Sequence, residues 1–375
     1  MMFVEAKWLY NHLLNLSEQK SVFNIKYTDI PVVTHYDKDK NKLESHLSYL
    51  SSQMKQGVLD AMCFSIRGLA ARKPNNGKIG KLKFVSEYKS INLKQANVSY
   101  KLVGKSKVKI QGIKKPLKVN GMEQITKIPE YDLANAKLIQ RNGDYYLAVT
   151  VYVKKTETKN DAKPRIGIDF GCQTSLTLSD GTKYNCVVEE TERIKTLKRK
   201  ASRSVKGSNN KRKLFLQIHR KNERLMNKKN DIANKICHNL KSYQVVMQDE
   251  QLSQWSQRGH GKAVTNGILG RVKHILTTRE DTIVLSKWCP TTKLCVECGT
   301  KVPLSQWDRQ FVCPHCGKEH DRDVHAAENM LWFAKNKIGV GRTCTLDEIR
   351  HSIEEYFNVE SVSLSQEAAN PLGWR

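Results

Sequence analysis

The sequence lacks the features of a membrane or secreted protein. It contains no run of 18 or more apolar residues, so it has no candidate membrane span. Its first residues show neither the basic segment nor the small-residue cleavage site of a signal peptide. Most of its ten cysteines follow no spacing typical of a disulfide framework. We therefore expect a cytoplasmic protein that has no membrane partner and keeps its thiols reduced.

Acidic residues are also scarce. The 375 residues include 37 Asp and Glu against 64 Lys and Arg, which gives a formal net charge of +27. Solubility does not require an excess of this size, and it indicates a polyanionic partner such as nucleic acid. The length is enough for two or three compact units.

Four cysteines do have a recognisable spacing. Two Cys-x-x-Cys pairs, Cys295 with Cys298 and Cys313 with Cys316, are separated by 14 residues. This pattern is typical of a zinc ribbon, in which four thiolates close a tetrahedral structural site around one Zn²⁺. The alternative is free thiols or disulfides. Cys289 and His315 lie close enough in sequence to be substitute ligands, although a bystander role is the simpler interpretation.

The segment 191–230 is strongly basic and has few acids to pair with. Apolar residues recur along a long helix expected from about Asn210, after a flexible stretch that begins at Ser202. A solvated helix face would explain the charges, but phosphate binding explains them better because acidic partners are so few. The candidate nucleic-acid-binding residues are Lys198, Arg199, Lys200, Arg203, Lys211, Arg212, Lys213 and Arg220.

Apolar spacing also predicts the other elements. Residues 1–75 have helical periodicity, with a second helix expected over 42–71. Residues 80–155 alternate apolar with basic positions around a turn at Asn142-Gly143, which predicts an antiparallel sheet and a small β-barrel. Beyond these we expect a loop over 253–270, a helix over 268–276, a strand over 282–286 and a helix over 346–357.

Three acids stand at the ends of predicted elements. Asp169 lies on the strand Arg165-Ile-Gly-Ile-Asp-Phe, and Glu250 (or Asp249) follows the strand that begins at Gln244. Asp323 (or Asp321) opens a helix directly after the zinc ribbon. Such a set can hold two Mg²⁺ ions about 4 Å apart and hydrolyse a phosphodiester. Alternatively, Asp169 only accepts turn hydrogen bonds at a strand end.

The order of these motifs resembles the TnpB family, transposon-encoded RNA-guided DNA endonucleases related to compact type V CRISPR effectors. Gly-Ile-Asp169-Phe-Gly resembles the first RuvC motif, Val-Val-Met-Gln-Asp-Glu250 the second, and Asp321-Arg-Asp323-Val-His-Ala-Ala the third. The four cysteines match the ribbon between the second and third motifs. The resemblance covers nearly the whole chain.

The resemblance implies a multidomain α+β protein whose nuclease domain is ribonuclease-H-like and carries an inserted zinc ribbon. It divides the chain into a helical recognition lobe with a truncated wedge start (1–78), a wedge β-barrel (79–156), the first part of the RuvC-like nuclease with the basic helix (157–288), the zinc ribbon (289–318), the last part of the nuclease (319–340) and a C-terminal tail (341–375). The family normally opens with a basic strand, whereas this sequence begins inside the first helix.

The activity implied is cleavage of double-stranded DNA directed by a guide RNA in a prokaryotic cytoplasm. Asp169, Glu250 and Asp323 would be the catalytic Mg²⁺ ligands, and Arg322 would contact phosphate or cap structure. One departure concerns the second motif, where Gln248 stands at the family's glutamate position and Glu250 lies two residues further on. Alternatives are a nuclease-dead RNA-guided repressor, a compact type V CRISPR effector, and a RuvC-like nuclease without a guide.

Overall fold

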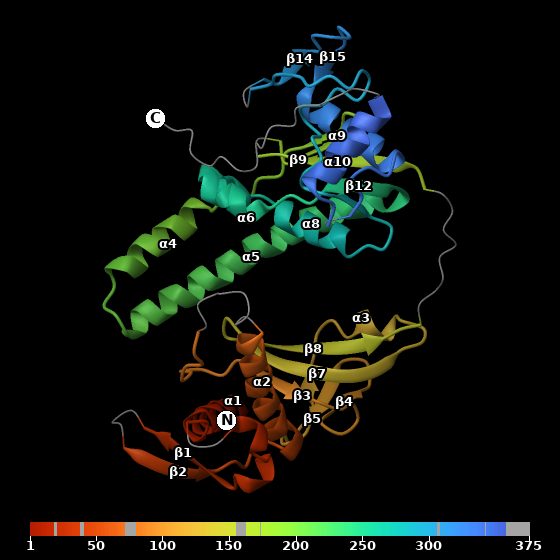
Figure 1. Cartoon of the computed structure of the whole chain (residues 1–375). Coiled ribbons are helices and arrows are strands. Elements are labelled where there is room, and N and C mark those ends of the chain that lie inside the picture. Colours follow the sequence, from red (N-terminus) through yellow and green to blue (C-terminus); the bar gives the residue numbers. More distant parts are fainter. Residues whose placement is uncertain are drawn as a thin grey trace. The chain divides into compact units, whose positions relative to one another are not determined.

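The computed structural model describes residues 1–18, 21–37, 41–71, 80–154, 163–172, 174–305, 308–341 and 343–357. It divides the chain into two compact units, Met1–Thr158 and Lys159–Arg375 (Figure 1). The expected boundary at residue 157 and most of the expected tail over 341–375 lie outside the described residues. The finer division into six segments therefore stays a prediction.

Two helices, α1 (Met2–Leu16) and α2 (Ser52–Ala70), form much of the core of the first unit. Glu5 is buried on α1, where its carboxylate accepts hydrogen bonds from the backbone N–H groups of Ser48, Tyr49 and Leu50 at 2.9–3.0 Å. This carboxylate fixes the chain that leads into α2. Short 3-10 turns lie at Val22–Asn24 and Tyr27–Asp29.

The prediction of a helix from residue 42 was wrong at its start. Residues 32–46 form an antiparallel hairpin of β1 (Val32–Tyr36) and β2 (Lys42–His46). Leu43 and Leu47 have helical spacing, but Leu43 lies on the exposed strand while Leu47 is buried beyond the strand's end. Apolar residues of two different elements thus imitated one helical stripe.

The strands expected in residues 80–155 are present. They are β3 (Ser90–Leu93), β4 (Tyr100–Val103), β5 (Lys107–Ile110), β6 (Leu117–Lys118), β7 (Asp132–Arg141) and β8 (Asp144–Tyr152), with the short helix α3 (Glu123–Thr126) before β7. Asn142 and Gly143 both have positive φ, 53° and 86°, and join β7 to β8 as the turn signal predicted. Hydrogen bonds link the strands into two three-stranded sheets, β3-β7-β8 and β4-β5-β6, so the closed barrel stays a prediction.

The second unit is built on a five-stranded sheet of order β11-β10-β9-β12-β13. Its strands are β9 (Arg165–Phe170), β10 (Leu176–Leu178), β11 (Lys183–Tyr184), β12 (Gln244–Gln248) and β13 (Ile283–Leu285). Strands β9, β12 and β13 are parallel, with β13 at one edge, while β10 and β11 run antiparallel at the other edge. Because β9 and β12 are parallel neighbours, the residues that follow them emerge at the same edge of the sheet.

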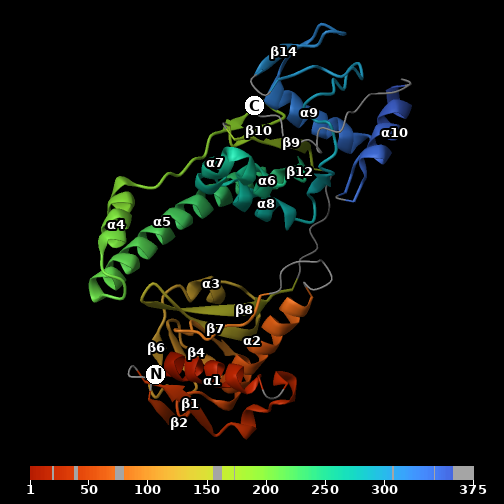
Figure 2. The ribbon, with the colours of Figure 1, turned by 60° about the vertical axis from the view of Figure 1, so that its left-hand side comes forward.

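Helices cover both faces of this sheet, as the two views in Figures 1 and 2 show. On one face, Ile168 of β9 and Met247 of β12 pack with α5 (Asn209–Asn239) and α8 (Leu269–Thr277). On the other face, Val246 of β12 packs with α9 (Arg322–Lys335) and α10 (Leu346–Phe357). The arrangement is a mixed α/β layer structure, and its ribonuclease-H-like assignment stays a prediction.

The remaining elements connect these layers. They are α4 (Glu192–Arg203), a 3-10 turn at Leu240–Ser242, α6 (Leu252–Trp255), a π-helical turn at Ser256–His260, α7 (Gly261–Asn266), β14 (Gln310–Val312) and β15 (Glu319–Asp321). The loop expected over 253–270 was therefore wrong, because α6, the π turn and α7 follow one another there. Its polar composition hid short helices. Among the residues that the structure describes, no helix has both the length and the apolar character needed to cross a membrane.

Candidate functional site

Asp169 lies near the carboxyl end of β9 and faces α9. Side chains alternate along a strand, and Ile166, Ile168 and Phe170 belong to the core on the α5 and α8 side. Asp169 must therefore point to the opposite face, together with Gly167. Strand β9 ends at Phe170, one residue after Asp169. The carboxyl group of Asp169 therefore lies at the edge of the sheet where β12 also ends.

Gly167 allows α9 to approach this face very closely. A Cβ atom at Gly167 would lie 2.0 Å from the carbonyl oxygen of Ala327 and 2.9 Å from its carbonyl carbon. Asp323 precedes Ala327 by four residues and so lies one turn away on the same side of α9. Asp169 follows Gly167 by two residues on the same side of β9. This contact between helix and strand directs Asp323 toward Asp169.

The electrostatics of Asp169 indicate that the predicted acids lie near one another. Burial raises its pKa well above the ordinary value, and the negative charges of Asp323 and Glu250 add to that shift. The Arg322 guanidinium acts in the opposite direction but does not cancel it. Three carboxyl groups from distant parts of the sequence thus lie within electrostatic range of one another. Such a cluster is suited to a divalent cation, which would offset their mutual repulsion.

Asp321, the alternative to Asp323, has a structural contact instead. Its carboxylate caps α9 by accepting hydrogen bonds from the N–H groups of Asp323 and Val324, at 3.1 and 3.2 Å. Lys183 on β11 also binds it, with 2.7 Å between Nζ and the carboxylate oxygen. Burial raises the pKa of Asp321, but these partners outweigh it and hold that pKa below the ordinary value. Asp323 itself lies 3.5 Å from a guanidinium nitrogen of Arg309.

Gln248, at the position where the resembling family has glutamate, is fully engaged in the core. Its side-chain amide donates hydrogen bonds to the carbonyls of Ser286 and Cys289, at 3.1 and 2.7 Å. Its oxygen accepts a 3.1 Å hydrogen bond from the Thr291 hydroxyl. The side chain is only 6% exposed. A carboxylate could not donate the two bonds to carbonyl oxygens, so an amide suits this place.

The two acids after Gln248 have different surroundings. Lys273 of α8 binds the carboxylate of Asp249 at 2.8 Å and also donates to the backbone carbonyl of Glu250. The charge of Glu250 raises the pKa of Asp169, whereas the carboxylate of Asp249 is held by Lys273. This arrangement favours Glu250 over Asp249 as the third member of the acid cluster.

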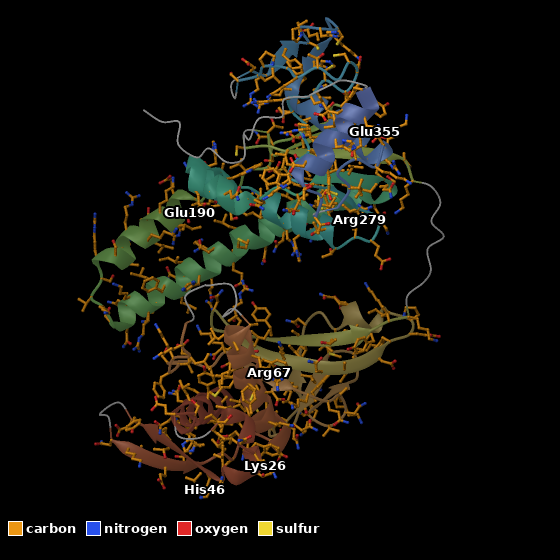
Figure 3. The ribbon with its side chains drawn as sticks, in the orientation of Figure 1. Lys26, His46, Arg67, Glu190, Arg279 and Glu355 are labelled. Carbon is orange, nitrogen blue, oxygen red and sulfur yellow. The ribbon has the colours of Figure 1, made fainter. Side chains whose placement is uncertain are left out.

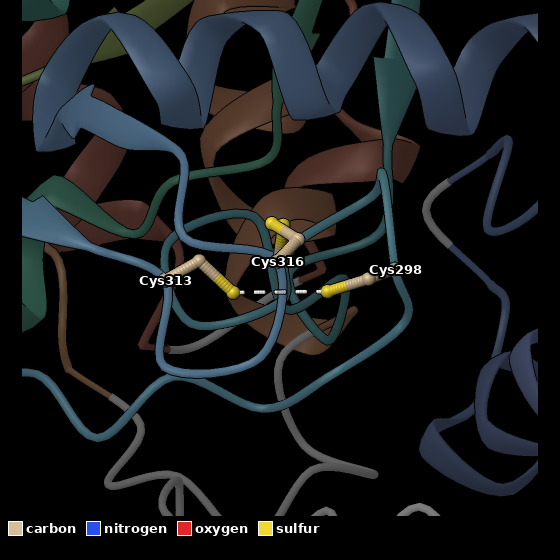
Figure 4. Close-up of side chains that lie close together, drawn as sticks. Cys298, Cys313 and Cys316 are labelled. Carbon is tan, nitrogen blue, oxygen red and sulfur yellow. Dashed lines mark hydrogen bonds between the residues drawn. The ribbon is translucent and has the colours of Figure 1, made fainter.

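The four cysteines predicted to bind zinc form a compact cluster. Their sulfur atoms all lie within 4.8 Å of one another, with 3.8 Å between Cys295 and Cys316 and 3.7 Å between Cys298 and Cys313. Figure 4 marks the contact between Cys298 and Cys313 with a dashed line. A tetrahedral zinc about 2.3 Å from each sulfur would space the sulfurs about 3.8 Å apart. The cluster is therefore compatible with one structural zinc.

The two substitute ligands lie outside this cluster. The Cys289 thiol is buried against Gly339, with 3.9 Å from its sulfur to the carbonyl oxygen of Gly339. His315 is exposed.

The cysteine cluster is tied directly to the helix that carries Asp323. The side chains of His325 and Asn329 on α9 both donate to the carbonyl of Leu294, at 3.1 and 2.7 Å, next to the first cysteine. Arg322 donates to the carbonyls of Ser305 and Asp308, at 3.2 and 3.3 Å. These contacts place the start of α9 against the cysteine-bearing segment. The structure thus favours the structural alternative for Arg322.

The eight candidate binding residues of segment 191–230 lie on two adjacent helices, α4 and α5, which extend from the sheet side by side (Figures 1 and 2). Leu197 and Ala201 of α4 pack against Ile218 of α5. All eight candidate binding residues are exposed except the half-buried Lys211. Lys198 is bound to Glu190, which Figure 3 labels just before α4. The expected flexible stretch from Ser202 is shorter than predicted, since α4 continues to Arg203 and Ser208 caps α5.

Some residues around the site were missed from the sequence. Three of the acids bind a basic side chain that the sequence did not single out. The pairs are Asp321 with Lys183, Asp249 with Lys273, and Asp323 with Arg309. Each is far in sequence from its partner, and a single lysine or arginine in so basic a chain gives no local signal. His320 and His325 did carry a signal in the sequence, because these two histidines flank the acids Asp321 and Asp323.

Comparisons with known proteins agree with the motif order. Residues 278–330 match the family described as Cas12f1-like, TNB domain, a segment that contains the four cysteines, Asp321 and Asp323. The chain is also 32% identical over 180 residues to a protein of Streptomyces pristinaespiralis named "Putative RNA-guided DNA endonuclease". These matches support a similarity to TnpB and Cas12f-like proteins. The resemblance inferred from the motifs is thus confirmed at this level.

Both matches are partial. The family match ends at residue 330 and begins after Asp169 and Glu250. The alignment to the Streptomyces protein covers 44% of this chain and 44% of that protein. The chain thus aligns with less than half the length of this relative, and the roles of the acids stay a prediction.

Proposed function

We propose that the protein is an RNA-guided DNA endonuclease. The observation that carries this proposal is that Asp323 and Glu250, from two other segments of the chain, both raise the pKa of Asp169 near the end of β9. The name of the Streptomyces relative and the match to the Cas12f1-like domain support the same activity. By resemblance, the gene would be associated with a transposable element.

The acid cluster fits magnesium by the chemistry of its donors. Mg²⁺ prefers carboxylate oxygens and keeps several of its bound waters. Three carboxylates, together with substrate phosphates, can therefore bind it. A pair of such ions supplies an activated water and stabilises the leaving oxygen of a phosphodiester. Asp169, Glu250 and Asp323 would hold the ions. Gly167 and the Asp321 cap would keep Asp323 in position on α9.

The cysteine cluster would have a structural role and would take no direct part in the cleavage reaction. One zinc held by Cys295, Cys298, Cys313 and Cys316 would stabilise the segment against which α9 begins. The exposed basic side chains of α4 and α5 would bind phosphates of the guide RNA or of the target DNA. Each phosphate that they neutralise would steepen the salt dependence of binding.

The first test is the nucleic acid that the protein carries. Protein purified from cells that express its own genomic neighbourhood should contain one RNA species with a constant part and a variable end. Sequencing of the bound RNA measures this directly. A random sample of cellular RNA would contradict the guide, and a nuclease without a guide would then be the better interpretation.

The second test is cleavage. With the bound RNA and Mg²⁺, the protein should cut a plasmid that carries the matching sequence, and Asp169→Ala should abolish cutting while RNA binding stays nearly intact. Asp231→Ala is a matched control, because Asp231 is exposed on α5 and pairs there with Lys235. A nuclease-dead repressor would bind the plasmid and leave it uncut with either protein. Cleavage by Asp169→Ala would show that the acid assignment is wrong.

The third test separates the acids after β12. Glu250→Gln should abolish cleavage, whereas Asp249→Asn should retain it and lose mainly the contact to Lys273. The rate of plasmid cleavage under saturating RNA measures both. Equal, full activity of the two variants would mean that another acid completes the cluster.

A further inference from the structure

A second group of metal-binding side chains lies beside the cysteine cluster. His320 is on β15, and His325 and Glu328 are one turn apart on α9. One ligand atom from each of these three residues lies within 4.8 Å of the others. The two imidazole rings are 4.2 Å apart between their centroids, and Phe311 packs against both.

The two histidines are buried, with exposed fractions of 8% for His320 and 2% for His325. Among the described residues, the Nε2 atom of His320 has no hydrogen-bond partner. A buried polar atom left in this state costs about 1–3 kcal/mol. A ligand at Nε2 would remove that cost.

The ring of His325 is already oriented as a metal ligand would be. Its Nε2 lies 3.1 Å from the carbonyl oxygen of Leu294 and donates to it. Metal-binding histidines usually donate their other ring N–H to a carbonyl or carboxylate, which fixes the tautomer and leaves the remaining nitrogen for the ion. In His325 the remaining nitrogen is Nδ1.

A carboxylate completes this group of side chains. Glu328 is exposed and supplies the negative charge, with Lys318 as a nearby cation.

We propose that His320, His325 and Glu328 bind one divalent transition-metal ion of the zinc class, at a site separate from the four cysteines. Two imidazoles and one carboxylate are a common ligand set for Zn²⁺, with water in the fourth position. The ion joins β15 to α9 across the turn that contains Asp321 and Asp323. It therefore braces the start of α9, where His325 also contacts the carbonyl of Leu294.

The test counts metal in the full-length protein without a histidine tag. Every protein carries the Asp169→Ala substitution, which weakens metal binding at the acid cluster. After loading with Zn²⁺ and extensive dialysis, the reference protein should hold two zinc ions per chain by atomic emission. His320→Ala should hold one. Glu319→Gln, which changes an exposed neighbour on the same strand, should still hold two.

Cobalt distinguishes loss of the site from loss of the fold. Co²⁺ at the cysteine cluster gives thiolate charge-transfer absorption, whereas Co²⁺ bound by two histidines and a carboxylate gives only weak visible bands. His320→Ala should keep the thiolate absorption and lose one equivalent of cobalt. Glu328→Gln, at an exposed position, should weaken the second equivalent about 10-fold or more without affecting the first. One metal equivalent in the reference protein, or an unchanged count in both variants, would overturn the proposal.

Discussion

The contact between Gly167 and Ala327 should decide whether Asp323 reaches Asp169. In Gly167→Ala the new Cβ would lie 2.0 Å from the Ala327 carbonyl oxygen, and real Cβ contacts are essentially never shorter than 3.0 Å. The backbone of α9 must therefore move by at least the difference, 1.0 Å, because no flexible side chain can give way. Overpacking of this kind costs about 1–3 kcal/mol of stability. A misplacement of about 1 Å in catalytic geometry can cost about 100-fold in rate.

The assay is plasmid cleavage with bound RNA and Mg²⁺, combined with urea denaturation of the same preparations. We expect Gly167→Ala to fold with reduced stability and to cleave about 100-fold more slowly. Gly270→Ala is the matched control, since its nearest atom lies 3.9 Å away and its helix does not carry an acid of the cluster. Wild-type cleavage and stability in Gly167→Ala would refute the inference that the close approach of α9 positions Asp323.

Three further predictions test neighbouring groups. Gln248→Glu should lower the free energy of unfolding by about 3 kcal/mol without increasing cleavage, because a buried carboxylate would face two carbonyl oxygens. Urea denaturation and cleavage assays measure these two effects, and faster cleavage would contradict the prediction. Asp321→Asn should retain cleavage because asparagine also caps helices, while Asp323→Asn should reduce it to background; loss of activity in both would give Asp321 a direct role. Hydrogen bonding from Arg279 lowers the pKa of Asp281 to about 2, so its stabilisation is present above about pH 4 and is lost as the pH falls toward 2. Asp281→Asn should therefore lower the free energy of unfolding by about 1–2 kcal/mol at pH 7, after allowance for solvent screening. The difference in free energy of unfolding from wild type should shrink in acid. A difference that grows in acid would contradict the prediction.

The parts of the fold that the sequence predicted are those with strong local signals. The helix over 346–357 and the turn at Asn142-Gly143 agree with the structure, because apolar period and turn chemistry act within a few residues. The hairpin over 32–46 was missed, since its few apolar residues lie at helical spacing but belong to a strand and to the chain beyond it. Period alone cannot tell these cases apart without knowledge of the partner strand.

The candidate site was predictable as a set of acids but not as a set of contacts. The strand alternation placed Asp169, and the helix start placed Asp321 and Asp323 side by side in sequence. Which of the two joins Asp169 depends on the cap and on Lys183, a residue 138 positions away. The engagement of Gln248 likewise depends on carbonyls of the segment after β13. Long-range partners of this kind leave no trace in the local pattern.

The order in which the chain is synthesised bears on when the acid cluster can exist. Asp169 and Glu250 are 81 residues apart, and Asp323 follows 73 residues later. On the ribosome, β9 and β12 can pair well before α9 has been made, yet their shared face stays uncovered until Gly167 meets Ala327. Closing such long loops is slow, and the exposed face is prone to aggregate in the meantime. A nascent chain or a fragment that stops before residue 323 therefore lacks a complete acid cluster, so any activity that depends on the cluster would begin only after α9 has been made.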